Sequence, residues 1–198
     1  AMILFFSGVN ALRQHVTSDV RIHGIITHGG DAPNIIPEYT KARFYVRANT
    51  IATCEEITNK VIQIAKGAAL STGCEVKYNT YQNIVEDLIV YPLFNELFKK
   101  IATEVGLIVE DINPNESKGS TDAGNVSHVI PTIHPSVKIC DSEVVTHTEE
   151  FKQAAISKQG DEGLLQSAEI LARIGLRLLS DGELLAQIKE EFELNKVR

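Results

Sequence analysis

The chain has 198 residues, a mass of 21.8 kDa and a net charge of −7, with 19 Lys and Arg against 26 Asp and Glu. This acidic balance disfavours nucleic acid and anionic membranes as main partners, and no apolar run reaches the roughly 18–20 residues that cross a bilayer. Three cysteines without a CxxC pair, and the lack of a recognisable signal peptide, predict a soluble protein of the reducing cytoplasm.

The first part of the chain predicts a small α+β unit. Its expected elements are a helix over 3–16, strands over 20–27 and 40–48, a helix from 53 to 73 and a strand over 75–81. The pattern Thr53-x-x-Glu56 is a capping box that would open the second helix, and Gly73 would end it. The order α-β-β-α-β is one strand short of the ferredoxin-like unit, so we expect the first strand to precede residue 1.

Side chains of the second expected strand alternate between two faces. The apolar face carries Ala42, Phe44 and Val46, and the polar face carries Lys41, Arg43, Tyr45 and Arg47. The guanidinium of Arg47 could form a bidentate pair with a carboxylate. The simpler alternative is a solvated strand face, since two further cationic side chains lie alongside.

The chain after residue 88 is predicted to be mainly helical. Its expected elements are a helix over 93–105 ended by Gly106, a strand over 107–112, a polar loop over 113–125, a β-type segment over 129–140 interrupted by Pro131 and Pro135, and helices over 149–157, 162–179 and 183–194. Asp161 and either Ser180 or Asp181 are candidate caps for the last two helices. Two short β segments with several helices are typical of one side of a larger α/β layer structure.

Three local patterns could carry chemistry. One is the loop around Gly29-Gly30, in which prolines flank Asn34, and the second is Arg47. The third is the polar loop Gly119–Asn125 together with His147, which stands just before an expected helix. The six histidines form no HExxH, HxH or Cys/His zinc spacing, and the chain has no GxSxG elbow. Each pattern alone is weak; a tight β-connection would also explain the first.

In their order and spacing, the three patterns resemble the zinc-dependent aminoacylase/carboxypeptidase family of amidohydrolases and metallopeptidases. The closest resemblance is to the branch of p-aminobenzoyl-glutamate hydrolase, with HGxIxxGGxAPNxIP at 23–37 and STDxGNVS at 120–127. The resemblance implies a di-metal α/β catalytic domain interrupted by an α+β lid that also forms the dimer. Residues 1–88 would be the ferredoxin-like lid without its first strand, and residues 89–198 the C-terminal part of the catalytic domain.

The resemblance also implies roles for individual residues. Asn34 matches a lid asparagine that contacts substrate, and Arg47 matches the arginine that binds the terminal carboxylate of a small amide substrate. Gly119, Ser120, Thr121 and Asp122 match the family's loop that lines the substrate pocket. His147 matches the last ligand of a divalent metal, expected to be zinc.

The family's remaining metal ligands, its glutamate general base and its substrate-polarising histidine have no counterpart in the chain, which therefore contains no catalytic residue. A zinc site needs three or four protein ligands, so we expect the 198 residues alone to be an inactive C-terminal half. Ala1-Met2 is typical of an expression scar before a start codon, and we expect a reading frame that begins there.

Three functional hypotheses follow. The first is a metal-dependent hydrolase, homodimeric through its lid, that cleaves the amide bond of N-acyl amino acids, dipeptides or aminobenzoyl-glutamate-like substrates. The second is a non-catalytic dimerisation or ligand-binding module. The third is a mononuclear metal site built from Asp122, His128, His134 and His147.

Overall fold

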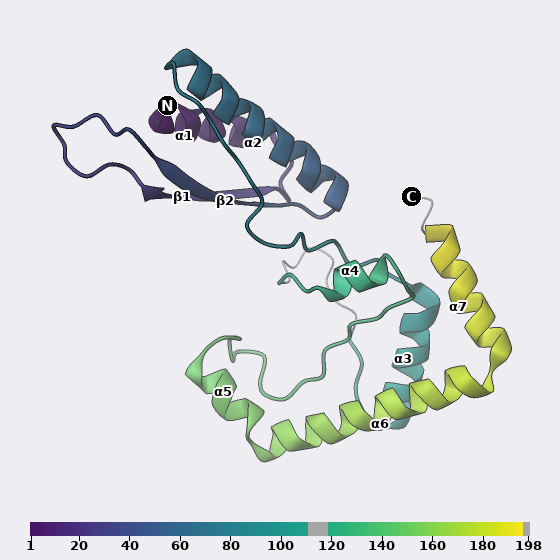
Figure 1. Ribbon diagram of the computed structural model, residues 1–198. Coiled ribbons are helices and arrows are strands. Elements are labelled where there is room, and N and C mark those ends of the chain that lie inside the picture. The colour runs from purple at the N-terminus through teal and green to yellow at the C-terminus, as the bar shows by residue number, and fades with distance from the viewer. Residues whose placement is uncertain (111–118, 196–198) are drawn as a thin grey trace. The chain divides into compact units, whose positions relative to one another are not determined.

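The computed structural model describes residues 1–110 and 119–195, and the chain divides into two compact units, 1–87 and 88–198 (Figure 1). Each unit has a hydrophobic core of its own. The identity of the two units as lid and catalytic part stays a prediction at this point.

The first unit is a two-stranded sheet with two helices. Its elements are α1 (Met2–Leu12), the short 3-10 helix η1 (Arg13–His15), β1 (Arg21–His28), β2 (Lys41–Arg47) and α2 (Ile51–Ser71). β1 and β2 pair antiparallel, with Arg21 opposite Arg47 at one end and His28 opposite Lys41 at the other. The predicted strands over 20–27 and 40–48 and both predicted helices are therefore confirmed, with ends shifted by a few residues.

Both helices of this unit cover the same face of the β-hairpin (Figure 1). The core between them is apolar: its buried members are Val9, Val20, Ile22, Ile57 and Val61. The predicted alternation of β2 is confirmed, because Phe44 and Val46 pack against this core while the odd-numbered residues of the strand are exposed. The hairpin thus has one buried face and one open, polar face.

The start of α2 differs from the predicted capping box. The Thr53 backbone N–H donates to the Thr50 hydroxyl at 3.3 Å, which makes Thr50 the cap and places Thr53 inside the first turn. Glu56 instead pairs with Lys60 one turn later, at 2.6 Å. The predicted end is confirmed: Gly73 has a φ of +67°, a left-handed conformation that suits glycine after a helix.

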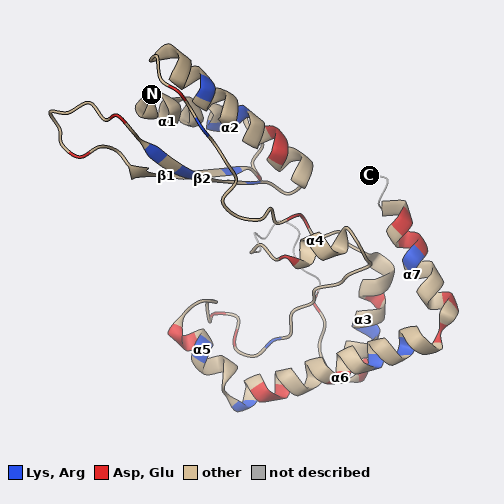
Figure 2. Cartoon of the chain, viewed as in Figure 1, with Lys and Arg blue, Asp and Glu red and all other residues tan. Residues whose placement is uncertain are grey.

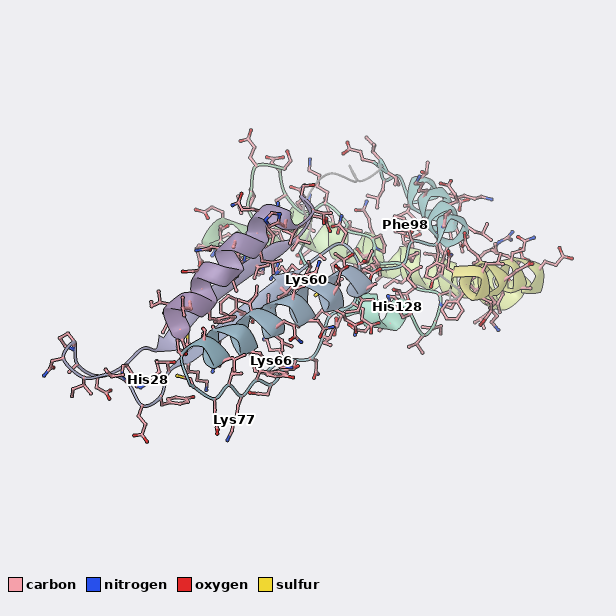
Figure 3. All side chains as sticks on the ribbon, turned by 90° about the horizontal axis from the view of Figure 1, so that it is seen from above. His28, Lys60, Lys66, Lys77, Phe98 and His128 are labelled. Atoms are coloured by element: carbon pink, nitrogen blue, oxygen red, sulfur yellow. The ribbon has the colours of Figure 1, made fainter. Side chains whose placement is uncertain are left out.

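The predicted strand over 75–81 is wrong, because residues 74–80 have no regular secondary structure. A strand needs a neighbouring backbone for its hydrogen bonds, and this segment contacts its surroundings through side chains instead. Lys66 on α2 lies 5.5 Å from the ring centre of Tyr78, and Figure 3 shows Lys66 and Lys77 on these two neighbouring segments. The four-stranded pattern of a ferredoxin-like lid is therefore not formed in the described residues, where the sheet has two strands.

The described part of the second unit contains five helices and no strand. The helices are α3 (Pro92–Glu104), α4 (Ala123–Ser127), α5 (Glu149–Ala155), α6 (Lys158–Ser180) and α7 (Gly182–Asn195). The predicted strand over 107–112 is wrong at 107–110, and its last two residues lie outside the described residues. The β-type segment over 129–140 is also not a strand, since Pro131 and Pro135 lack the N–H groups that a ladder needs. Of the predicted loop over 113–125, residues 113–118 lie outside the described residues and residues 123–125 belong to α4.

Three helices enclose the core of the second unit. Its buried members are Leu97, Ile101 and Ala102 of α3, Ile170 and Ile174 of α6, and Ile188 of α7. The cap of α6 is Ser157, whose hydroxyl accepts from the Gly160 N–H at 3.1 Å, and not Asp161 as predicted. Asp181 precedes α7, and its carboxylate accepts from the Leu184 N–H at 3.0 Å. No helix in the described ranges is long and apolar enough to span a membrane.

Candidate functional site

The open face of the hairpin is basic. Its exposed polar residues are Arg21 and His23 on β1, and Lys41, Arg43, Tyr45 and Arg47 on β2, and the apolar Ile25 is exposed beside them. Neither strand contains an acidic residue; β1 carries Arg21, and β2 carries Lys41, Arg43 and Arg47 (blue for Lys and Arg in Figure 2). Because every second side chain of a strand points to the same side, the hairpin presents these cations together.

Arg47 ends β2 and lies directly opposite Arg21 in the antiparallel register. Arg21 donates through Nη1 to the carbonyl oxygens of Ser18 at 2.6 Å and Val20 at 2.9 Å, which holds its guanidinium near the start of β1. The exposed guanidinium of Arg47 forms no salt bridge within residues 1–110 and 119–195. The geometry leaves this group available for an incoming carboxylate.

Aromatic contacts order the middle of the same face. The Arg43 guanidinium lies 5.3 Å from the ring centre of Tyr81, and the rings of Tyr45 and Tyr81 are 5.8 Å apart. The Tyr45 hydroxyl also hydrogen-bonds the side-chain oxygen of Gln82 at 2.5 Å. Burial is the main cause that raises the pKa of the Tyr81 phenol above its ordinary value, so this side chain stays neutral over the physiological range.

Asn34 lies at the other end of the hairpin, in the loop between the strands. The base of this loop is closed by the rings of His28 and Tyr39, whose centres are 5.6 Å apart. Gly30 has a φ of +117°, and a Cβ there would stand 2.6 Å from Pro37, so the turn requires glycine. Arg47 is six residues along β2 from the loop end at Lys41, about 20 Å at ~3.3 Å per residue. The structure therefore does not bring the exposed side chain of Asn34 close to Arg47.

The predicted pocket loop, Gly119–Asp122, leads directly into α4. The Thr121 side-chain hydroxyl accepts from the Ala123 N–H at 3.3 Å, and the Thr121 backbone carbonyl accepts from the Gly124 N–H at 3.1 Å. These bonds end the loop in one helical turn, with Ser120 and Asp122 exposed to solvent.

Ser127, at the far end of α4, anchors this turn to the entry of α3. Its side chain is fully buried; the hydroxyl donates to the Gly124 carbonyl at 2.6 Å and accepts from the Ile89 N–H at 2.9 Å. The buried Tyr91 hydroxyl donates to the Ser127 carbonyl at 2.6 Å. Ser127 is part of the motif at 120–127, but the motif alone predicted no role for it. Its burial is the signal that identifies it as the anchor of the loop.

His147 is exposed in the turn before α5 and has a φ of +67°. It is the one non-glycine residue with positive φ in the described ranges. Thr148 fixes the turn, because its hydroxyl donates to Val145 O at 2.7 Å and accepts from the Phe151 N–H at 3.2 Å. A histidine in this sparsely populated conformation stores backbone strain, and such strain is most often found at functional sites.

The alternative metal site of Asp122, His128, His134 and His147 is not formed. Among the residues that the structure describes, no three His, Cys, Asp or Glu side chains lie close enough to share a metal ion. Since a zinc site needs three or four protein ligands, the described residues by themselves do not fit a zinc ion.

Comparison with known proteins gives two kinds of match. Residues 9–72 match the peptidase dimerisation domain family. The chain is 35% identical to the human Xaa-Arg dipeptidase over 198 residues and to the mouse Xaa-Arg dipeptidase over 197 residues, in both cases 98% of this chain and 45% of the relative. It is also 33% identical over 78 residues to one of the polypeptides of the p-aminobenzoyl-glutamate hydrolase of Escherichia coli K12, which covers 39% of this chain and 16% of that protein.

The chain is a homologue of these hydrolases. The resemblance predicted from the motifs is thereby confirmed, including its branch. The matched domain, residues 9–72, contains the hairpin with its basic face and the whole of α2. The chain spans about half the length of the two dipeptidases.

Proposed function

We propose that this chain supplies the substrate-carboxylate site and one metal ligand of a metal-dependent hydrolase. The substrates would be small amides with a terminal carboxylate: N-acyl amino acids, dipeptides or aminobenzoyl-glutamate-like compounds. The observation that carries the proposal is the exposed guanidinium of Arg47 on an acid-free face inside the peptidase dimerisation domain. The names of the relatives support it, since a dipeptide and p-aminobenzoyl-glutamate each contain an amide bond and a terminal carboxylate.

Arg47 would bind the terminal carboxylate through two parallel N–H···O bonds and so orient the amide. Asn34 lies at the opposite end of the hairpin, so its contact with the same small substrate would need a second protomer or another arrangement of the loop. The loop residues Gly119, Ser120, Thr121 and Asp122 would line the pocket, held in place through the Ser127 anchor.

His147 would provide one ligand for a divalent metal, expected to be zinc, which polarises the amide carbonyl and lowers the pKa of a bound water when present. The other ligands would come from polypeptide that corresponds to the part of the relatives outside the matched 45%. Exposed leucines on α6 support the presence of this further polypeptide. So many large apolar side chains on one helix indicate a surface that another part of the protein covers. They are Leu164, Leu165, Leu171, Leu176 and Leu179.

A second candidate function is a non-catalytic dimerisation or ligand-binding module. It is favoured by the match of residues 9–72 to a dimerisation domain. Both candidates include a homodimer formed through residues 1–88 and a location in the cytoplasm.

The carboxylate site can be tested on the chain itself. We expect N-acetyl-L-alanine to shift backbone NMR signals at the Arg47 end of β2, and Arg47→Gln to weaken this binding about tenfold through the loss of a charge-assisted pair. Arg173→Gln is the matched control, because Arg173 is also exposed but pairs with Glu169 on α6. Equal affinity of Arg47→Gln and the unchanged chain would remove Arg47 from the site.

Catalysis and assembly need separate measurements. We expect no turnover of dipeptides or N-acyl amino acids by the 198 residues with added zinc; turnover that His147→Ala abolishes would show a complete site in this chain. Light scattering after size-exclusion chromatography should give twice the 21.8 kDa mass of the chain, and a monomer would contradict the dimer.

A further inference from the structure

Tyr45 is the neighbour of Arg47 along the open face of β2. Every second side chain of a strand lies on the same face, so the Cα atoms of these two residues are about 7 Å apart at ~3.3 Å per residue. Two hydrogen bonds of about 2.8 Å each, one to either oxygen of a carboxylate, span a similar distance. A carboxylate held by Arg47 is therefore within reach of the Tyr45 hydroxyl.

The Tyr45 hydroxyl is already engaged by another segment of the same chain. It donates to the side-chain oxygen of Gln82 at 2.5 Å. A phenol has a single O–H to donate, so this hydroxyl cannot donate to Gln82 and to a ligand at the same time. Gln82 thus takes the place of a ligand's acceptor beside Arg47.

Two further contacts hold this segment in place without using that hydrogen bond. The ring centre of Tyr81 lies 5.3 Å from the Arg43 guanidinium. A few residues later, the Asp87 carboxylate accepts from the Ile51 N–H at 2.8 Å, at the start of α2. The backbone of the segment therefore stays attached to the hairpin and to α2 when the Gln82 side chain moves.

The Gln82 side chain has room to move. It is exposed, residues 80–84 line an open hollow of about 470 Å³, and none of these residues belongs to a hydrophobic core. Displacing Gln82 breaks one hydrogen bond between neutral groups. A carboxylate is the stronger acceptor, because hydrogen bonds to ionised groups are roughly twice as strong as neutral ones. A bound carboxylate can therefore replace the Gln82 amide at Tyr45.

We propose that the Tyr45 hydroxyl is a second carboxylate-binding group of the Arg47 site, and that Gln82 occupies it in the ligand-free chain. The incoming carboxylate accepts from both Arg47 and Tyr45, and the Gln82 amide moves into solvent. Gln82 is thus a built-in competitor that lowers the affinity of the site. The inference rests on the proposed function, and it adds a binding residue and an autoinhibitory contact to that site.

The experiment is an NMR titration of the full chain and its variants with N-acetyl-L-alanine. Gln82→Ala frees the Tyr45 hydroxyl, so we expect about fivefold tighter binding, equivalent to one neutral hydrogen bond. Tyr45→Phe keeps the ring and removes the hydroxyl, so we expect about fivefold weaker binding, and Gln82→Ala should bring no gain in the Tyr45→Phe background. Asn83→Ala is the matched control, because Asn83 is exposed in the same segment, and it should leave the affinity unchanged.

The same titration reports the displacement directly. In the unchanged chain, the side-chain amide signals of Gln82 should shift with N-acetyl-L-alanine and stay in place with N-acetyl-L-alaninol, which lacks the carboxylate. The spectrum of each variant also shows whether it is folded.

Equal affinity of Gln82→Ala and the unchanged chain, or a gain that persists in the Tyr45→Phe background, would overturn the roles of Tyr45 and Gln82. The proposed function is measured by a different variant, since Arg47→Gln should weaken binding about tenfold with or without Gln82. A chain in which Arg47→Gln weakens binding but Gln82→Ala changes nothing keeps the carboxylate site and loses the competitor. A chain whose affinity does not depend on Arg47 loses both.

Discussion

Replacing Ser127 with alanine would cut the connection between α4 and the entry of α3. The substitution keeps the Cβ and removes a hydroxyl that makes two short hydrogen bonds, to the Gly124 carbonyl at 2.6 Å and from the Ile89 N–H at 2.9 Å. Ser127 is fully buried, so water does not readily replace the lost partner. The change therefore leaves one donor and one acceptor of the backbone without their partners.

The expected cost follows from those two groups. A buried polar group that loses its hydrogen bond costs about 1–3 kcal/mol, and the Ile89 amide is only partly buried. We expect a loss of about 2 kcal/mol in the free energy of unfolding of the second unit, which corresponds to roughly 30-fold in the equilibrium constant. The Ile89 amide should also exchange faster with solvent, since its acceptor is gone.

Urea unfolding followed by circular dichroism measures the free energy, and amide hydrogen exchange measures the local effect at Ile89. The matched control is Ser180→Ala: this serine is exposed and its hydroxyl donates to the Arg177 carbonyl at 3.3 Å, so its loss should cost less than about 0.5 kcal/mol. If Ser127→Ala matched the control and the Ile89 amide remained protected, the anchoring role of Ser127 would be refuted.

Two further outcomes test the second unit. A Cβ at Gly160 would stand 2.6 Å from the backbone oxygen of Ala154, so Gly160→Ala should lower the free energy of unfolding by about 2 kcal/mol or more. Gly175 lies in open space on the same helix, so Gly175→Ala should raise the free energy of unfolding by about 0.5–1 kcal/mol. Thermal unfolding that ranks the two variants the other way would contradict this prediction. Burial, and then the charge of Glu191, raises the pKa of the Tyr91 phenol above its usual 10.0. The Tyr91 phenol therefore ionises at a lower pH in the unfolded chain than in the folded chain, and the free energy of unfolding should fall as the pH rises above about 10. Urea unfolding should show that Tyr91→Phe loses less stability than the unchanged chain between about pH 8 and 10.5. An equal loss in both would argue against this contribution of Tyr91.

The helices and the faces of the hairpin could be predicted because they depend on local spacing. Apolar residues three and four apart define α3. Gly73 follows the C-terminal end of α2 and Gly106 that of α3, and the backbone is left-handed at both glycines. The alternation of β2 likewise separates Phe44 and Val46 from Arg47. In each case the signal lies within a few residues of the element that it specifies.

The candidate site was less predictable, because it depends on the register between segments distant in the chain. Motifs identified Arg47 and His147, but the neighbour of Arg47 across the sheet, Arg21, follows only from the pairing of β1 with β2. The conformation of His147 and the burial of Ser127 are likewise properties of the folded chain.

The sequence by itself therefore determined the chain's homology, its helices and the polar face of β2, all of which are encoded in motifs and periodicity. The tertiary structure decided that residues 75–81 are not a strand and that Arg47 faces another arginine. The physical reason is that a strand and a binding site both require partners from elsewhere in the chain. Whether those partners are present, and which residues they bring, is decided only when distant segments meet.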